Sequence, residues 1–140
     1  TEDIKNEIDR MVREEKLSLK QAECIKLKDI DTFAGSSIGE RIKRAYAYGG
    51  VKREQPFVFE YDRQLVQGVI DLYFIEDGQL VIVDYKTDRV LRGRAGEDEL
   101  RRRYSIQLDY YAMALSQITG LKVKEKVIYS FALGRSLTVE

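Results

Sequence analysis

The sequence predicts an α/β fold in which helices flank a mixed central sheet, with a helical segment at the N-terminus. Three observations lead to this prediction. Apolar residues recur at helical spacing near the N-terminus, and three consecutive runs in the middle of the chain have the composition of strands. A long helical stretch then precedes two more strand-like runs. The order of helices, a three-strand meander, a helix and further strands implies a mixed sheet with helices packed on it.

The 140 residues suffice for one domain, in which residues 1–35 form a helical segment and residues 36–140 the core. The first helix is expected over residues 1–16, which carry an apolar stripe at helical spacing: Ile4, Ile8, Met11 and Val12. Ser18 is expected to cap a second helix, which stops at Gly35.

A third helix and a meander of three strands are expected next. Ser37 is expected to cap a short helix that ends at Gly49 and Gly50. Three strand-like runs follow, over residues 53–62, 64–75 and 79–87. The last two are joined by Asp77-Gly78, a dipeptide that strongly indicates a hairpin turn.

The last third of the chain supplies the long helix and the remaining strands. A loop rich in arginine and glycine over residues 88–99 leads into a helix over residues 98–119, with Gly120 as its C-cap. Residues 122–133 and 136–140 then have the pattern of strands.

The register of the expected hairpin decides where its charged residues lie. With Asp77 and Gly78 as a two-residue loop, Asp71 stands directly opposite Asp84, and their Cβ atoms are roughly 5 Å apart. A four-residue loop keeps this register, whereas a three-residue loop breaks it. Lys86 points to the same face as Asp84 because side chains two apart on a strand share a face.

These charges indicate a cation site. Residues 80–83 leave no polar face beside Asp84, so the strand is expected to be central and buried, where a charge is costly unless something binds it. Facing carboxylates repel each other, and Mg²⁺ prefers oxygen ligands. A lysine such as Lys86 beside the ion can stabilise phosphoryl charge. The alternative, for a D-x-K triplet alone, is a solvated ion pair on an edge strand.

Composition excludes several classes of site. The 24 basic and 24 acidic residues balance, so any basic surface for a nucleic acid must be local. Because the chain has no histidine, its chemistry must rest on carboxylates, lysine, tyrosine and bound ions. A single cysteine, Cys24, excludes disulfide frameworks and iron–sulfur clusters. No signal peptide and no apolar run of roughly 20 residues is present, which favours a cytoplasmic protein without a membrane partner. The start without methionine suggests a fragment of a longer chain.

Three short motifs in order, "GVID", "VDYKT" and "QLDYY", resemble those of the RecB-type nucleases of the PD-(D/E)XK superfamily. From about Leu17 onward the chain is similar to the C-terminal nuclease domain of the AddA family of bacterial helicase–nucleases. The resemblance implies a restriction-endonuclease-like core in the bacterial cytoplasm. It also implies Mg²⁺-dependent hydrolysis of single DNA strands in double-strand-break repair, with Mn²⁺ or Ca²⁺ able to substitute in binding. ATP would bind only the helicase part, and the partners would be DNA, the rest of an AddA chain and an AddB-like protein.

The resemblance also implies roles for individual residues. Asp71 and Asp84 match the metal-binding acids, and the backbone carbonyl of Tyr85 is similar to a further metal ligand. Lys86 matches the catalytic lysine.

Gln107 and Tyr111 match the "QxxxY" motif of these nucleases and complete the expected catalytic set. They lie at i and i+4, so both project from one helix face, with Tyr104 one turn before. The alternative is that the tyrosines belong to an apolar stripe that faces the core: Tyr104, Leu108, Tyr111 and Leu115.

Arginines gather around the loop and the entrance of the long helix: Arg89, Arg92, Arg94, Arg101, Arg102 and Arg103. Of these we expect Arg89, Arg101 and Arg103, together with Tyr104, to contact DNA, with the phosphates held by charge and by backbone amides. Nothing in the sequence suggests direct readout of bases. The alternative is a solvated face balanced by Asp88 and the acidic residues of the loop.

One family feature is missing. RecB-type nucleases carry a further histidine on an upstream helix, and this chain has none, so the isolated chain is expected to cut DNA weakly or not at all. Glu54 is the nearest acidic candidate for the missing ligand, but a surface position on the strand explains it better. Two other functions stay open: an inactive nuclease-fold module that docks DNA or protein, and a Cas4-like nuclease, which the lack of cysteines disfavours.

Overall fold

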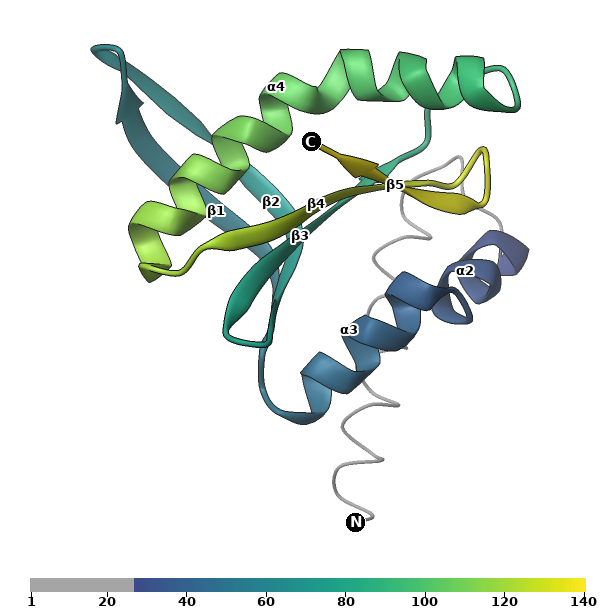
Figure 1. Ribbon diagram of the computed structural model, residues 1–140, viewed down its shortest axis with the longest axis horizontal. Coiled ribbons are helices and arrows are strands. Elements are labelled where there is room, and N and C mark those ends of the chain that lie inside the picture. The colour runs from purple at the N-terminus through teal and green to yellow at the C-terminus, as the bar shows by residue number, and fades with distance from the viewer. Residues whose placement is uncertain (1–26) are drawn as a thin grey trace.

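The computed structural model describes residues 27–140, which form an α/β domain (Figure 1). Its elements are α2 (Leu27–Ala34), α3 (Ser37–Ala47), β1 (Val51–Tyr61), β2 (Gln64–Glu76), β3 (Gln79–Lys86), α4 (Arg94–Thr119), β4 (Val123–Ser130) and β5 (Arg135–Val139). The helix predicted over residues 1–16, the Ser18 cap and Cys24 lie outside the described residues.

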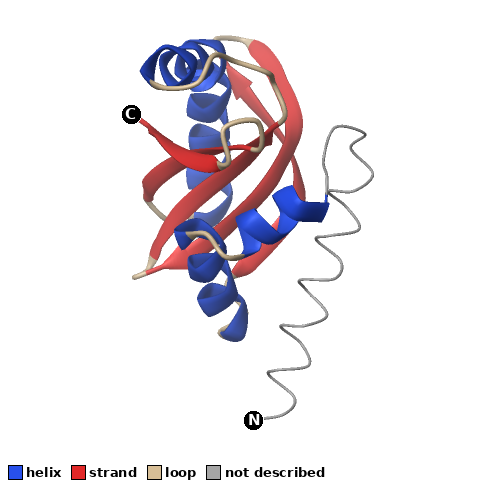
Figure 2. Ribbon diagram, turned by 90° about the vertical axis from the view of Figure 1, so that its right-hand side faces the viewer, coloured by secondary structure: helices blue, strands red, loops and turns tan. Residues whose placement is uncertain are grey.

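The five strands form one mixed sheet in the order β1-β2-β3-β4-β5, which confirms the predicted fold class. β3 and β4 pair in parallel and the other neighbours pair antiparallel. The parallel pair requires a crossover, and α4 provides it. Figures 1 and 2 show α4 on one face of the sheet and α2 with α3 on the other.

Each face of the sheet has its own hydrophobic core. Phe33, Phe74 and Tyr129 belong to the core under α2 and α3, whereas Ile82 and Leu108 belong to the core under α4. The four residues of β3 from Leu80 to Val83 are all fully buried, which confirms the prediction of a central strand.

The β2–β3 hairpin has the predicted register. Glu76 pairs with Gln79, and the ladder continues in step to Leu72 opposite Val83. Asp77 and Gly78 form the loop with φ values of 54° and 74°. Two consecutive positive φ angles are typical of the type I′ turn, whose twist matches that of the flanking strands.

Several predicted element ends differ from the structure, most of them by one or two residues. Ser36, not Ser37, caps α3, because its Oγ accepts a hydrogen bond from the N–H of Gly39 at 3.2 Å. α4 begins at Arg94, four residues before the predicted start, after Gly93 at a φ of 85° and without a side-chain cap. β4 ends at Ser130 rather than at residue 133, because the chain turns there toward Gly134. The predicted stops at Gly35 and Gly120 are confirmed: the N–H of Gly35 bonds to Asp31, and Gly120 is left-handed.

Candidate active site

The side chains of β2 change sides of the sheet at Asp71. Ile70 lies in the core under α4, yet Leu72, two residues on, lies in the core under α2 and α3. Side chains two apart on a regular strand share a face. The backbone of β2 is therefore irregular between Ile70 and Leu72.

The paired position on β1 shows the same change. Phe57 lies under α4, whereas Val51, an even number of residues away, packs against the opposite core. Between them Glu54 has a φ of 50°, a left-handed conformation that is uncommon for residues other than glycine. The ladder pairs Arg53 with Leu72 and Gln55 with Ile70, and it skips the pair between them, Glu54 and Asp71.

This break turns the carboxylate of Asp71 toward β3. The N–H of Tyr85 donates to Oδ2 of Asp71 at 2.8 Å, and the β2–β3 ladder has ended one pair earlier, at Leu72 and Val83. The register thus holds as predicted up to that pair. Asp71 itself has no partner in this ladder. Its side chain instead accepts the hydrogen bond from the N–H of Tyr85, the residue after Asp84.

Asp84 is only 2 % exposed at the end of the buried stretch of β3. Nζ of Lys86 lies 2.9 Å from Asp84 Oδ2, which forms an ion pair. The angles of this contact are not those of a hydrogen bond, so Oδ2 has no hydrogen-bond partner among residues 27–140. The ammonium of Lys86 offsets part of the charge of this buried carboxylate, and a metal cation is a further ligand that suits an oxygen without a regular hydrogen bond.

Burial and the charge of Asp84 raise the pKa of Asp71 to about 7. The hydrogen bond from Tyr85 and the charge of Lys86 act in the opposite direction and do not offset this. The two carboxylates therefore repel one another, and a divalent cation would relieve the repulsion. Hard oxygen donors of this kind fit Mg²⁺. No group of three or more acidic, histidine or cysteine side chains gathers around an ion site within residues 27–140.

Tyr85 offers only its backbone to this site. Its ring points to the other face of the sheet, where it meets Phe33 edge to face at 5.4 Å and also contacts Phe131. A metal ligand at Tyr85 would therefore be a main-chain atom, as the resemblance implies.

α4 brings two of its predicted residues to Lys86. Gln107 Oε1 accepts a hydrogen bond from Nζ of Lys86 at 3.0 Å. The same Nζ lies 4.0 Å from the centre of the Tyr104 ring. The strand and the helix thus meet at the lysine.

Tyr111, one turn after Gln107, is both a core residue and a neighbour of the carboxylates. It is 7 % exposed, and its ring contacts Phe57 edge to face at 5.4 Å. Burial, and then the charges of Asp84 and Asp71, raise the pKa of Tyr111 to about 12. Its hydroxyl therefore stays protonated at neutral pH and can donate a hydrogen bond.

Comparison with known proteins assigns this arrangement to a family. The model of the PD-(D/E)XK nuclease superfamily matches residues 2–137. The chain belongs to the PD-(D/E)XK nuclease superfamily. The superfamily is named after a pattern of two acidic residues and a lysine. Here Asp71 is the first acid, and Asp84 and Lys86, one residue apart, complete the pattern.

Curated relatives of this nuclease domain are named as ATP-dependent helicase/nuclease subunits. The chain is 40% identical over 97% of its length to the one from Thermoanaerobacter pseudethanolicus and likewise to the one from Acetivibrio thermocellus. It is 34% identical over 93% to the one from Clostridium novyi. The chain spans only 12%, 12% and 11% of these three proteins.

The fold has a solved counterpart. A protein described as an exonuclease from Eubacterium rectale superposes with a TM-score of 0.51 at 15% sequence identity. The match covers 98% of this chain and 57% of the other. At this identity the likeness concerns the fold alone.

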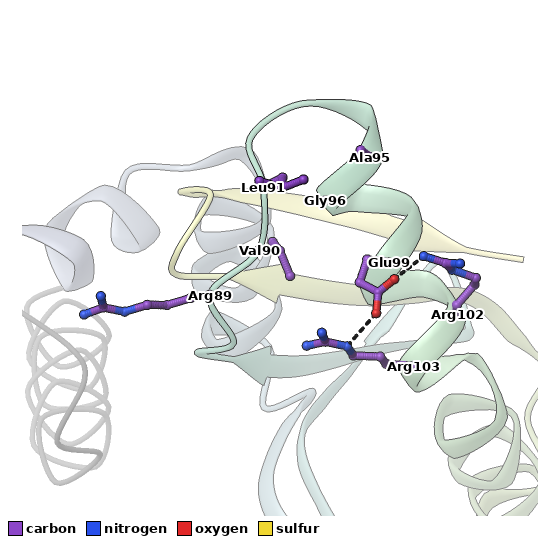
Figure 3. A pocket seen from close by; sticks show the side chains of 8 residues that line it. All are labelled: Arg89, Val90, Leu91, Ala95, Gly96, Glu99, Arg102 and Arg103. Carbon is purple, nitrogen blue, oxygen red and sulfur yellow. Dashed lines mark hydrogen bonds and ion pairs between the residues drawn. The ribbon is translucent and has the colours of Figure 1, made fainter.

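The arginines of the nuclease domain do not form one group. Arg103 bonds to Asp88 at 2.9 Å and to Glu99 at 3.0 Å. Arg101 donates to the carbonyl of Thr138 on β5 at 3.0 Å. Arg89 extends from the other side of the loop (Figure 3).

A pocket of about 510 Å³ lies between this loop and the first turns of α4 (Figure 3). It is lined by Arg89, Val90, Leu91, Ala95, Gly96, Glu99, Arg102 and Arg103. Arg102 and Arg103 both point to the carboxylate of Glu99.

Sequence reasoning missed the part that Asp88 plays, having treated it only as a balancing charge. Asp88 Oδ2 accepts hydrogen bonds from the hydroxyl of Tyr104 at 2.5 Å and from Arg103. The partners are 15 and 16 residues apart in sequence. No local spacing rule reaches that far, and only the position of Asp88 directly after the "DYKT" motif could have drawn attention to it.

Proposed function

We propose that this chain is the metal-dependent deoxyribonuclease domain of a bacterial helicase–nuclease, and that it hydrolyses phosphodiester bonds of unwound single strands during repair and recombination. The observation that carries the proposal is the joint placement of Asp71, Asp84 and Lys86. The buried carboxylate of Asp84, the partly buried carboxylate of Asp71 with its raised pKa, and a lysine 2.9 Å from Asp84 form the arrangement that metal-assisted phosphoryl chemistry needs.

Asp71, Asp84 and the backbone carbonyl of Tyr85 are the proposed ligands of Mg²⁺, for which Mn²⁺ or Ca²⁺ can substitute in binding. When bound, the ion supplies charge stabilisation at the phosphate and a more acidic water. Asp84 is suited to this role because its Oδ2 is buried and lacks a hydrogen-bond donor among the described residues.

The other proposed catalytic residues act on the phosphate. Lys86 presents its ammonium beside Asp84 and stabilises negative charge that develops on the phosphoryl oxygens. Gln107 holds that ammonium by its Oε1. Tyr111 keeps its proton and can donate it as a hydrogen bond to a phosphate oxygen. Tyr111 is buried, and Lys86 and Gln107 are partly buried, which strengthens their electrostatic effect.

We propose that the DNA strand leaves the site over the pocket at the start of α4. Arg89 and Arg102 line this pocket, with Arg102 paired to Glu99 (Figure 3), and the exposed Leu91 offers an apolar surface to a base. Arg101 lies beside β5, and its proposed contact would be to a more distant phosphate. Arg103 and Tyr104 both donate hydrogen bonds to Asp88. Their proposed contacts to DNA would therefore have to be made alongside these bonds or in place of them.

The remaining proposals concern the context of the domain. By analogy with its relatives, single strands would be delivered by an ATP-driven motor in the same polypeptide, in the bacterial cytoplasm. An AddB-like protein would complete the complex. ATP would bind the motor and not this domain.

The test measures Mg²⁺-dependent release of short fragments from labelled single-stranded DNA. The chain is assayed alone and extended upstream by the histidine-bearing helix of a relative. The extended chain should cut, and Asp84→Asn and Lys86→Ala should each abolish cutting. Asp109→Asn alters the ion pair between Asp109 on α4 and Lys126 on β4; it is the matched control and should cut normally.

Two results would contradict the proposal. Cleavage at the wild-type rate in both site variants would remove these residues from the chemistry. An extended chain that binds Mn²⁺ but stays inert on single strands would favour the docking module instead.

A further inference from the structure

The ammonium group of Lys86 has three neighbours that suit its charge. Oδ2 of Asp84 lies at 2.9 Å, Oε1 of Gln107 at 3.0 Å, and the centre of the Tyr104 ring at 4.0 Å. The face of an aromatic ring attracts a cation at this distance. The three partners come from β3 and from α4, so together they fix the position of Nζ in the site.

The Tyr104 ring is itself held at its far end. Its hydroxyl donates to Oδ2 of Asp88 at 2.5 Å, and Arg103 donates to the same oxygen at 2.9 Å. Arg103 is in turn bonded to Glu99 one turn earlier on α4. The ring therefore has little freedom to rotate away from the lysine.

The protonation states of Tyr104 and Asp88 suit the hydrogen bond between them. Burial, and then the hydrogen bond to Asp88, raise the pKa of Tyr104 to about 12, so the phenol keeps the proton that it donates. Burial would raise the pKa of Asp88, but the hydrogen bonds from Tyr104 and Arg103 outweigh it and lower that pKa. Asp88 therefore accepts as a carboxylate at neutral pH.

The loop that carries Asp88 is fitted closely to α4. A Cβ atom on Gly96 would lie 1.7 Å from the carbonyl oxygen of Leu91, so only glycine allows this approach of the loop to the helix. Asp88 stands two residues after Lys86, and the loop brings it back over the helix at Tyr104.

We propose that Asp88 and Tyr104 are positioning residues for Lys86, which assigns Tyr104 and its neighbour Arg103 to the lysine rather than to DNA; this rests on the proposed nuclease function. Lysine has a long flexible side chain, and a misplacement of about 1 Å can cost a hundredfold in rate. The ring limits where Nζ can lie, and Asp88 fixes the ring.

The test compares substitutions that remove the ring with substitutions that remove only its anchor. Tyr104→Leu deletes the ring face, Tyr104→Phe keeps it and deletes the bond to Asp88, and Asp88→Asn removes the charge. Tyr110→Leu is the matched control for ring loss, because Tyr110 is also half-buried on α4 but its ring contacts Tyr61 at 5.7 Å. Asp109→Asn is the control for loss of a carboxylate.

The first readout needs no catalysis. In NMR spectra of protein with ¹³C-labelled lysine, the ε-methylene protons of Lys86 should resonate upfield because they lie over the Tyr104 ring. Lys86→Arg identifies the signal. The upfield shift should be lost in Tyr104→Leu, kept in Tyr104→Phe and in Tyr110→Leu, and reduced in Asp88→Asn. An unchanged signal in Tyr104→Leu would overturn the proposal, and this result does not depend on whether the chain cuts DNA.

The second readout separates positioning from DNA contact. Cleavage at saturating single-stranded DNA should fall by about tenfold to a hundredfold in Tyr104→Leu and less in Tyr104→Phe and Asp88→Asn. The Kd for the same strand, measured with Ca²⁺ in place of Mg²⁺, should be unchanged in all three variants. A raised Kd with a normal rate at saturation would overturn the proposal in favour of a DNA contact. The cleavage rates are measured in the extended chain, and an inert extended wild type would contradict the proposed function alone, since the NMR readout still reports on the lysine.

Discussion

Glu54 and Asp71 occupy the position that the ladder of β1 and β2 skips, and there both strands shift their side chains from one face of the sheet to the other. The left-handed backbone of Glu54, at a φ of 50°, accompanies the turn on β1. On β2 the turn frees Asp71 from the ladder, and its carboxylate reaches the N–H of Tyr85. The irregularity of an edge strand thus places a residue of the candidate metal site.

A first prediction tests the backbone of Glu54. Glu54→Val should destabilise the fold by about 1–2 kcal/mol, because a β-branched side chain is disfavoured at positive φ. Glu60→Val, at an exposed position of the regular part of the same strand, should cost little. Urea denaturation of both variants measures the difference. Equal costs would show that the conformation of Glu54 does not constrain the strand.

A second prediction concerns metal binding. Mn²⁺ or Mg²⁺ should raise the Tm of the wild type, because an ion that binds only the folded state stabilises it by about 2.7 kcal/mol at a concentration of a hundred times Kd. The rise should be much smaller in Asp84→Asn, which removes one charge of the carboxylate pair. Thermal unfolding with and without the ion gives both values. An equal rise in the two proteins would count against the site.

A third prediction follows from the close approach at Gly96. Gly96→Ala should destabilise the protein by about 1–3 kcal/mol, because its Cβ would overlap the carbonyl oxygen of Leu91 and the loop must move. Gly35→Ala is the control, since the nearest atom to its Cβ would be the oxygen of Asp31 at an ordinary 3.6 Å. Its stability should change by no more than about 0.5 kcal/mol. A tolerated Gly96→Ala would mean that the loop is not fixed to α4.

A fourth prediction concerns acid. Hydrogen bonds from Arg41, which outweigh the opposing effect of burial, lower the pKa of Glu76 from 4.5 to about 2. Because the folded pKa is below the unfolded one, the contribution of Glu76 to stability is present above about pH 4.5 and is lost as the pH falls toward 2. The Tm of the wild type should therefore fall more between pH 6 and pH 3 than that of Glu76→Gln. Glu60→Gln, on the exposed side of β1, should follow the wild type, and parallel curves for all three would refute the assignment.

The parts of the site that depend on local rules could be predicted from sequence. The Asp77-Gly78 turn predicted the register of the hairpin, and the run from Leu80 to Val83 predicted the burial of Asp84. Both follow from turn chemistry and side-chain alternation, which act over a few residues. The membership in the nuclease superfamily also follows from short motifs at their spacing.

The parts that depend on tertiary contacts could not be predicted. Nothing in the residues around Glu54 signals a left-handed backbone, since neither glycine nor asparagine stands there. The early start of α4 at Arg94 has no capping side chain to indicate it. Asp88 meets Tyr104 only because the loop folds back over the helix, which no pattern in the loop encodes.

No helix within residues 27–140 is long and apolar enough to cross a membrane.

The crossover through α4 also sets the order in which the site can assemble during folding. The meander of β1, β2 and β3 joins neighbours in sequence, whereas the parallel pair of β3 and β4 must wait until 36 intervening residues have closed into place, from Thr87 to Lys122. Gln107 and Tyr104 reach Lys86 only in that late step. A half-folded chain on the ribosome therefore carries the two carboxylates without the helix that completes them. Under the proposed function, a chain whose last strands have not docked lacks the contacts from α4 that hold Lys86 in the site.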